Sequence, residues 1–596
     1  MLIGGLGVHL EKTLIKNMKL GKGFYSKMDK VFSNLRADHD VATLDLSRKK
    51  IEELKNMHVD VTDNVSKLAI KSQRSNGLVK GVRGTGKSHL LLIARDKVNS
   101  NNEHLCIYIN LQEHLNIGGT VISQERFYIY TLIKQLKRQL FYLINERDKD
   151  AKFTERIMGK LKSYFSFSSD KEAYLKEILD KMNDLLSIGE ADLTLFLKEN
   201  SQSKSNSKSS EVAATSELSV TGTKNSVTGK ANVGSTFQEN ESYQSNSLLD
   251  LETFKGLILE IISNLGLNGI TFFYDEWSTL SSDDQEKLSI LIRGLSTSPI
   301  YHWIAYIPYK SSLGVLEKTA DFPNDIDLDL SFIYEENPRI CVNYFKEFIN
   351  KRMNAEFKTN EFNVENILRR EVLDLLIKCS MGNTRDFGVI LNKAWENYKI
   401  DYLSTGKNTV ISKKHIKKAI KDLSEEKQDN LRNKSKSQYA SKLWNELVDF
   451  TKAKKHTHFA IELTDRNLSF LGDSEMEDLL YHRLIHLRKK DYPGKEDGDP
   501  RLAIYAIEPS ALYYAIFETT NTVKQVKLVT DNLTIHNQIR RYTFDLYKII
   551  KNYRIEQGKH IQCLNDTCGK VITEDMKYAL DNKVCIFCGT PLIIHE

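Results

Sequence analysis

The hydrophobic positions along the chain predict a helix-rich α/β protein. Most segments repeat apolar residues at helical spacing and carry charged residues on the opposite face, whereas a few short apolar runs are typical of buried strands. Strands are predicted at 77–80, 104–111, 270–275 and 302–307. Amphipathic helices are predicted at 88–98, 122–147, 151–165 and 170–199.

The polar segment 201–247 breaks this pattern. It contains 13 serines in 47 positions, with lysine, asparagine, threonine and glycine between them. Little apolar surface is available there to offset the entropy lost on folding, which favours a disordered linker. A polar β-hairpin is the alternative, because several apolar residues partly alternate with polar ones.

Composition and charge exclude several classes of protein. A chain of 596 residues is long enough for about three to five domains, and 40% hydrophobic and 28% charged residues are ordinary for a globular protein. The net charge of +6 excludes a uniformly basic nucleic-acid coat protein, and seven cysteines exclude a disulfide-rich scaffold. Because no long apolar run and no signal-peptide pattern is present, we expect a cytoplasmic protein without a membrane partner.

The sequence GVRGTGKS at 81–88 matches the phosphate loop G-x-x-x-x-G-K-[ST] and lies between a predicted strand and a predicted helix. Its glycines allow consecutive backbone N–H groups to turn inward around an anion, and the helix start adds a partial positive charge. Lys87 is expected to reach the β- and γ-phosphates of ATP, and the Ser88 hydroxyl to bind Mg²⁺. A plain glycine turn is the alternative. The predicted ATP-binding residues of this loop are Gly81, Gly84, Thr85, Gly86, Lys87 and Ser88.

The predicted strand at 270–275 ends in Asp275 and Glu276, which is the Walker B arrangement. Asp275 is expected to hold the Mg²⁺ shell, and Glu276 to orient and polarise the attacking water, so Glu276 and Lys87 are the predicted catalytic residues. Taken alone, an apolar strand that ends in acids is common. Asp275 follows Lys87 by 188 residues, far more than a compact core needs, so residues near 120–255 are predicted to be an insertion.

These motifs, together with the sequence SMGNTRDF at 380–387, resemble the AAA+ branch of P-loop ATPases and its origin-recognition-complex (ORC)-like initiators. The resemblance covers about residues 50–425, apart from the insertion. It implies a parallel-sheet core with a helical lid, in which Arg385 reaches the γ-phosphate as the sensor 2 residue. The alternative is a helix-surface arginine that pairs with Asp386 or another neighbour.

Two parts of the family pattern are not matched clearly. The polar sensor 1 residue expected after the strand 302–307 is absent, and Ser311 is the nearest substitute, which we do not assign. No arginine finger is clear, although Arg293 could act across a subunit interface. ATP binding is therefore predicted more firmly than efficient hydrolysis.

Four of the seven cysteines lie in the last 34 residues and form two knuckles, Cys563-x4-Cys568-Gly569 and Cys585-x2-Cys588-Gly589. Each knuckle places two thiolates for tetrahedral zinc, and the glycine permits the tight turn. We predict a structural zinc ribbon, because four protein ligands leave no position for a substrate. Four free cysteines or a redox pair are the alternatives.

The charge is concentrated in residues 408–560, which contain 28 lysines and arginines and 21 aspartates and glutamates. One basic cluster (413–421) is predicted along a helix, and a second (482–490) at the end of another helix. A turn and the strand 502–507 follow, an order compatible with the winged helix that ORC-like proteins carry after the lid. The clusters are either ordinary solvated helix faces or contacts to the phosphate backbone of DNA.

The predicted division is an N-terminal helical region (1–75), an ATPase core (76–340), a helical lid (341–425), a winged-helix-like basic region (426–555) and a zinc ribbon (556–596). The first functional hypothesis is an AAA+ switch that couples ATP to homo-oligomerisation and DNA binding. The resemblance implies a mobile-element or antiphage defence setting as one possibility. The alternatives are a STAND-like signalling ATPase that senses a protein trigger and acts through a partner effector, and a scaffold subunit that binds ATP but hydrolyses it poorly.

Overall fold

The computed structural model describes most of the predicted core and C-terminal part of the chain. The predicted helix 151–165 and the polar segment 201–247 lie outside the described residues, and within 170–199 the described stretch 180–187 is helical. Apart from isolated positions and the short gap 573–575, the described ranges are 24–33, 48–112, 125–145, 180–187, 251–329, 333–358, 363–405, 411–434, 439–517, 537–556 and 561–592.

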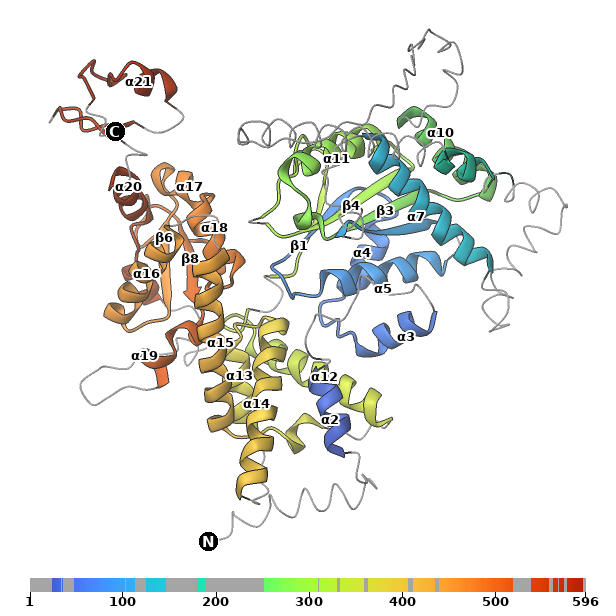
Figure 1. The fold of residues 1–596 in the computed structure, drawn as a ribbon, viewed down its shortest axis with the longest axis horizontal. Coiled ribbons are helices and arrows are strands. Elements are labelled where there is room, and N and C mark those ends of the chain that lie inside the picture. The colour runs from blue at the N-terminus through green and yellow to red at the C-terminus, as the bar shows by residue number, and fades with distance from the viewer. Residues whose placement is uncertain are drawn as a thin grey trace, which may run out of the picture.

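A five-stranded parallel sheet forms the centre of the N-terminal half, with the strand order β2-β3-β4-β1-β5 (Figure 1). Strands β1 to β4 are largely apolar because helices cover both faces of the sheet. The four predicted strands are confirmed, and β5 is added at the edge beside β1. The strands are β1 (Gly77–Lys80), β2 (Leu105–Asn110), β3 (Ile270–Asp275), β4 (Ile300–Tyr306) and β5 (Asn324–Asp327).

Alternate residues of each strand face two different apolar cores. On one face, α3 (Arg48–Met57), α4 (Asn64–Lys71) and α5 (Lys87–Asn99) cover side chains such as Val79 and Phe273. On the other, Leu78 and Phe272 pack with a second set of helices. These are α7 (Glu125–Asn145), α10 (Leu251–Leu265) and α11 (Ser282–Leu295). Helix α7 falls within the predicted insertion, but it packs directly on β2.

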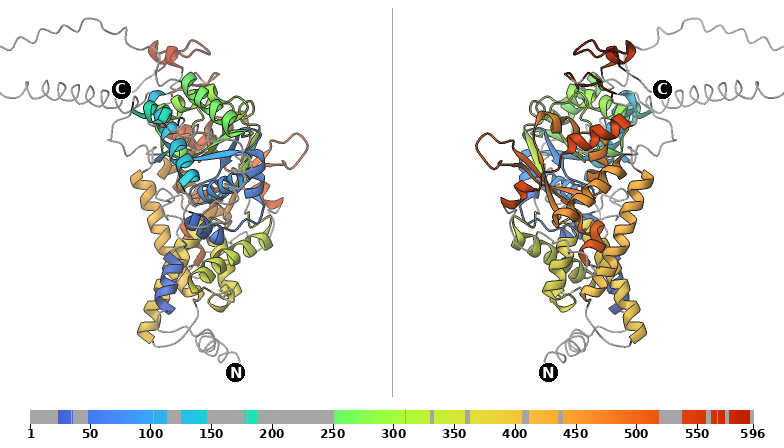
Figure 2. Two further views of the ribbon diagram at one scale, coloured as in Figure 1. Left: turned by 90° about the vertical axis from the view of Figure 1, so that its right-hand side faces the viewer. Right: turned by 90° about the vertical axis from the view of Figure 1, so that its left-hand side faces the viewer.

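A helical bundle follows the sheet and includes an N-terminal helix. Figures 1 and 2 show α2 (Phe24–Ser33) lying along the bundle helices, and the Trp395 indole N–H donates to the Asp29 carboxylate at 2.6 Å. Phe345 and Phe387 stack in its core with ring centroids 4.2 Å apart. The bundle helices are α12 (Pro338–Phe357), α13 (Arg370–Cys379), α14 (Thr384–Thr405) and α15 (Lys413–Lys434).

Residues 440–507 form a small unit with the element order of a winged helix. Three strands make an antiparallel sheet in the order β6-β8-β7, and helices α16, α17 and α18 pack against it. Helix α20 (Leu546–Glu556) contacts α17 from outside this segment. The elements are α16 (Ala440–Lys454), β6 (His458–Glu462), α17 (Asp465–Leu471), α18 (Ser474–Tyr481), β7 (Ile485–Tyr492) and β8 (Leu502–Ile507). Short elements follow at η5 (Pro509–Leu512), α19 (Tyr513–Phe517) and η7 (Asn537–Arg541).

The second basic cluster does not end a helix as predicted. Helix α18 stops at Tyr481, and the segment from Ile485 onward is strand β7, which pairs with the fully buried β8. Pairing with this apolar strand outweighs the local helical pattern, because it buries Ile485 and the Arg488 side chain. Much of the cluster therefore faces inward.

Buried ion pairs join the helical bundle to the winged-helix unit. Arg483 donates from Nε and Nη2 to the two Asp386 oxygens, each at 3.0 Å, and Lys427 donates to the same carboxylate at 2.7 Å. Lys427 also lies 3.2 Å from Glu508, which accepts a hydrogen bond from His486 at 2.5 Å. Burial opposes the ionisation of Asp386, but Arg483 and Lys427 hold its pKa well below its usual range.

We expect Asp386→Ala to destabilise the protein by about 3–5 kcal/mol, because it leaves two buried cations without their carboxylate. Chemical denaturation followed by tryptophan fluorescence measures the loss. Asp429→Ala, which removes an exposed partner of Arg432, is the matched control and should change stability by less than about 0.5 kcal/mol. Equal effects of the two substitutions would contradict a structural role for the buried pair. Because the folded pKa of Asp386 is depressed, its contribution is complete above about pH 4 and is lost as the pH falls further.

A separate C-terminal unit lies beyond α20 (Figure 1). It contains the antiparallel pair β9 (Ile561–Gln562) and β10 (Val571–Ile572), followed by α21 (Lys577–Asp581). Within the part of the chain that the structure describes, no helix has the length and apolar character needed to cross a membrane.

Candidate functional site

The predicted phosphate loop and the acidic pair meet at the carboxyl edge of the sheet. The loop follows β1 and the acids end β3, and β4 separates these two strands. The carboxyl ends of parallel strands are where open α/β sheets bind ligands. The strand order therefore leaves one strand between the two motifs.

The phosphate loop has the backbone that its glycines were predicted to allow. Gly84 and Gly86 have φ values of 92° and 90°, in the left-handed region. Lys87 folds back over the loop and donates from Nζ to the carbonyl oxygens of Gly81 at 2.7 Å and Val82 at 3.1 Å. The Thr85 hydroxyl donates to the same Val82 oxygen at 3.0 Å.

A carboxylate from outside the motif occupies one amide of this loop. Asp329, just after β5, accepts a hydrogen bond from the Val82 N–H at 2.8 Å. Burial lowers the pKa of Lys87, and the charges of Asp329, Asp275 and Glu276 oppose that shift. These interactions place the Lys87 ammonium among the acids of the site.

The two Walker B acids occupy different environments. Asp275 is buried, and its carboxylate accepts hydrogen bonds from the Tyr108 hydroxyl at 2.7 Å and from the Glu276 N–H at 2.9 Å. Glu276 has φ 58°, a left-handed conformation that only a few per cent of non-glycine residues adopt. Burial raises the pKa of Glu276, as does the neighbouring Asp275 charge, while Lys87, Arg83 and Arg385 act in the opposite direction.

Helix α14 brings Arg385 to the phosphate loop. Asn383 caps this helix through its side-chain oxygen, which accepts from the Arg385 N–H at 3.0 Å, and its amide donates to the Arg83 carbonyl at 3.2 Å. The Thr384 hydroxyl donates to the Gly84 carbonyl. A Cβ on Gly84 would lie 2.4 Å from the Arg385 Cβ, so glycine is needed for this approach.

The structure thus brings together Lys87, the neighbours Asp275 and Glu276, and Arg385 from three separate segments. Arg385 is half-buried at this site, and the Asp386 carboxylate is held by Arg483 and Lys427. This placement favours the sensor 2 hypothesis over a surface arginine. The roles of the individual residues stay predictions.

The unassigned positions have contacts of their own. The Ser311 hydroxyl bonds to Ser278 at 2.7 Å, beside the turn that follows Glu276. Arg293 donates to the Val315 carbonyl at 3.1 Å on the surface. Neither contact assigns a sensor 1 residue or an arginine finger.

Sequence reasoning missed three residues that shape the site. Tyr108 holds Asp275 from the adjacent strand, Asp329 caps Val82, and Asn383 ties the lid to the loop. Asn383 was within a motif that the sequence singled out, and its place before a helix is an N-cap signal. Tyr108 and Asp329 had no local signal, because their partners are 167 and 247 residues away.

The residues present fit ATP and Mg²⁺. Open space surrounds Gly86 at the N-terminus of α5, where backbone N–H groups and the helix dipole favour phosphate. Ser88, half-buried on the first turn of that helix, and Asp275 supply the oxygen ligands that Mg²⁺ prefers.

The four C-terminal cysteines also fit a zinc ion. Their Sγ atoms all lie within 4.8 Å of one another, with Cys563 and Cys588 at 3.5 Å and Cys568 and Cys585 at 3.8 Å. Four sulfurs about 2.3 Å from a tetrahedral zinc would be about 3.8 Å apart. Hydrogen bonds with Thr590 lower the pKa of Cys588 to about 6, which favours the thiolate, whereas the pKa values of Cys563 and Cys568 are raised, with burial and the neighbouring thiols among the causes.

The glycine after each cysteine pair adopts the left-handed backbone that a tight turn requires. Gly569 and Gly589 have φ values of 51° and 72°, and the Gly589 N–H donates to the Cys585 carbonyl at 2.8 Å. This small unit has a core of six buried residues, so a bound metal would supply much of its stability.

We expect a strong chelator to release about one zinc per chain and to unfold only this C-terminal unit, because the metal-binding free energy is its folding free energy. A colorimetric zinc assay and hydrogen exchange over 561–592 measure the two effects. Exchange in the sheet core should not change. Release of no zinc, or unfolding that extends to the ATPase core, would contradict the prediction.

Comparisons with known proteins give little further information. No family model matches the chain, and no curated protein matches it. Among solved structures, the chain is similar to Cdc6p from Pyrobaculum aerophilum, with 11% identity and a TM-score of 0.29, over 88% of this chain and 98% of that chain. A TM-score this low does not establish a shared fold.

Proposed function

We propose that this protein is an AAA+ ATPase that binds ATP and Mg²⁺ and hydrolyses ATP. The observation that carries the proposal is the convergence of the phosphate loop, the Asp275-Glu276 pair and the Arg385 turn on one edge of the sheet. A structural glycine turn would not require a half-buried lysine beside three carboxylates.

The residues have distinct parts in the proposed reaction. Lys87 exchanges its loop carbonyls for the β- and γ-phosphates, while loop amides bind phosphate oxygens. Glu276 accepts a proton from the attacking water at its carboxylate, and its raised pKa makes it a better base than an exposed glutamate. Arg385 stabilises the negative charge on the γ-phosphate. Mg²⁺, when bound by Ser88 and Asp275, neutralises charge on the phosphates.

We propose further that nucleotide state controls homo-oligomerisation and DNA binding. Residues 408–560 carry seven more basic than acidic residues, and part of this segment has winged-helix element order. Helix α18 contains three acidic residues and no basic one, so DNA contact is assigned to the exposed lysines of α15 instead. Those are Lys413, Lys414 and Lys418. Lys413 pairs with Glu371 at 3.1 Å and Lys414 with Asp401 at 3.0 Å, so DNA phosphates would replace these exposed carboxylate partners.

The test is the ATPase rate with and without duplex DNA at low and high salt. We expect stimulation by DNA that is lost at high salt, because phosphate contacts release counterions. Replacing the three α15 lysines by alanine should reduce the slope of log DNA affinity against log salt concentration by about three. Lys287→Ala in the core is the matched control and should leave that slope unchanged. DNA-independent turnover would contradict the DNA-binding part of the proposal and leave the ATPase part standing.

A second candidate is a signalling ATPase that senses a protein trigger and acts through a partner effector. One observation favours it, namely that the C-terminal unit exposes large apolar side chains, which mark protein contact sites more often than DNA contacts. Binding of a protein partner to these apolar side chains of the C-terminal unit, without any effect of DNA on ATP turnover, would select this candidate. The exposed side chains are Leu564, Tyr578, Ile586 and Phe587. The mobile-element or antiphage setting stays a prediction.

A further inference from the structure

The turn 381–386, which carries Arg385 and Asp386, is held between two parts of the molecule. On one side it contacts the phosphate loop, through Asn383 to the Arg83 carbonyl and through Thr384 to the Gly84 carbonyl. Its backbone is left-handed at Met381 and Gly382, with φ values of 51° and 78°. These residues form the left-handed cap of α13, which the Gly382 N–H closes by donating to the Ile377 carbonyl at 3.3 Å.

On the other side, two arginines of the winged-helix unit hold both ends of this turn. Arg483 binds the Asp386 carboxylate with two hydrogen bonds of 3.0 Å. Arg488 donates from Nη1 to the Met381 carbonyl at 3.2 Å and pairs with Glu335. Arg483 itself has φ 56°, so the chain adopts a rarely populated conformation at the contact.

The Glu335 pair fixes Arg488 in the same interface. Glu335 accepts from Arg488 Nε at 3.0 Å and contacts His458 Nε2 at 2.6 Å. All three side chains are buried. Burial opposes the ionisation of Glu335, but Arg488 and His458 hold its pKa well below its usual range.

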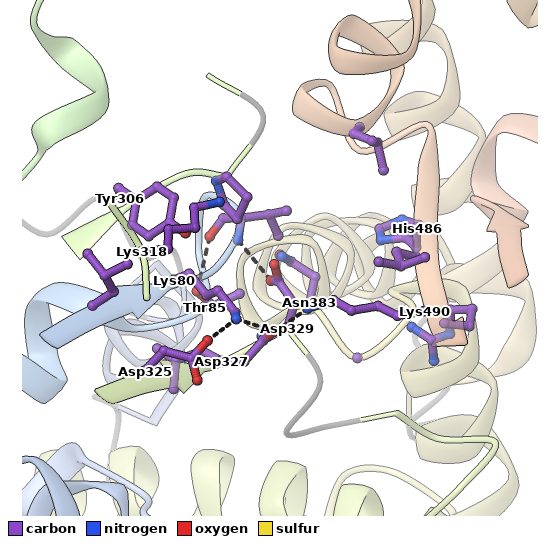
Figure 3. A pocket seen from close by; sticks show the side chains of 18 of the residues that line it. Lys80, Thr85, Tyr306, Lys318, Asp325, Asp327, Asp329, Asn383, His486 and Lys490 are labelled. Carbon is purple, nitrogen blue, oxygen red and sulfur yellow. Dashed lines mark hydrogen bonds and ion pairs between the residues drawn. The ribbon is translucent and has the colours of Figure 1, made fainter. Parts of the chain in front are cut away.

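The contacts from the winged-helix unit to the sheet core are of a different kind. A cavity of about 610 Å³ lies between the winged-helix unit and the sheet core. His486 and Lys490 of β7 line one side, and Lys80, Asp325 and Asp327 line the other (Figure 3). Lys490 spans it to Asp327 at 3.1 Å with its side chain half exposed.

A second contact to the core is made by Lys310, which donates to the Tyr481 hydroxyl at 3.1 Å. Exposed pairs such as Lys490–Asp327 contribute little because solvent screens them, whereas the Arg483 pair with Asp386 of the lid is buried and bidentate. The winged-helix unit should therefore move with the lid rather than with the core.

We propose that Arg483 and Arg488 are positioning residues for Arg385, and that they couple the nucleotide in the ATPase site to the position of the winged-helix unit. This inference rests on the proposed ATPase function. Binding of the γ-phosphate by Arg385 tightens the turn 381–386, and the two arginines transmit that constraint to β7. In the reverse direction, a partner that displaces the winged-helix unit weakens ATP binding, because coupling between two sites is reciprocal.

The test compares the affinities of the full-length protein for ATP and ADP, measured with fluorescent analogues. Arg483→Gln should lower the ATP-to-ADP affinity ratio by about tenfold, as Arg385→Ala should, because both affect the γ-phosphate contact. The double variant should show no further loss. Arg501→Gln, which removes an exposed pair with Asp491 in the same unit, is the control and should keep the ratio.

Hydrogen exchange in the unaltered protein gives a second measurement, which does not depend on how well a variant folds. ATP should slow exchange in 381–386 and 481–490 together, relative to ADP. A folded Arg483→Gln protein with an unchanged ratio, or protection confined to 381–386, would overturn the coupling alone. Failure of the unaltered protein to bind ATP would overturn the proposed function and the coupling with it.

Discussion

Lys87→Ala should reduce ATP affinity by about 100-fold or more, to the point where binding is no longer detected at micromolar nucleotide. The Lys87 ammonium lies among Asp329, Asp275 and Glu276, and its two hydrogen bonds are to loop carbonyls that phosphate can replace as partners. Removing one member of a buried charge pair costs about 2–5 kcal/mol, which is about 30-fold to several thousand-fold in affinity. Isothermal titration with ATP and Mg²⁺ measures the loss.

The same helix offers a matched control for this substitution. Lys97 is in the last turn of α5, is exposed, and donates to the Ser66 hydroxyl at 2.7 Å. Lys97→Ala should leave ATP affinity within about twofold, because exposed polar contacts contribute little. If Lys87→Ala binds ATP as well as Lys97→Ala does, the loop at 81–88 is not the phosphate site.

Short-range sequence patterns predicted the phosphate loop and the buried strands around it well, and the reasons are physical. The phosphate loop requires particular residue types at fixed spacing, and the buried strands β1 to β4 require continuous apolar runs because both faces of the sheet are covered. Strand β5 was missed because its sequence, NDID, is polar, and it forms by pairing with β1 at the sheet edge. The cysteine spacing was sufficient to predict the four-sulfur cluster, because each of its two cysteine pairs is local in sequence.

The charged residues were harder to interpret, since sequence shows a charge but not its partner. Arg483 and Arg488 were grouped with a possible DNA-binding cluster, yet their carboxylates come from Asp386 and Glu335, 97 and 153 residues away. A net positive segment can therefore be an internal ion-pair network. The same limit applies to Tyr108, whose bond to Asp275 crosses between neighbouring strands.

Glu276→Gln should lower the rate of ATP hydrolysis by about 100-fold to 10,000-fold while leaving ATP bound. Glutamine keeps the shape of the side chain but cannot accept the water's proton, and loss of a positioned general base has effects of this size. ATP affinity should hold or rise, because the substitution removes a negative charge near the phosphates. Phosphate release and retention of radiolabelled ATP on a filter measure the two effects together.

The geometry of Glu276 sharpens the comparison with other acids of the same region. Glu276 is half-buried, has φ 58°, and has a pKa raised by burial and Asp275, whereas Asp283 on α11 is exposed and pairs with Lys287 at 2.7 Å. Asp283→Asn should therefore leave turnover unchanged. Glu276→Asp keeps the carboxylate but withdraws it by one methylene, so its rate should fall between those of the glutamine variant and the unaltered protein. Unchanged turnover in Glu276→Gln would show that another group activates the water, and the acid pair at the end of β3 would then serve only to bind the metal.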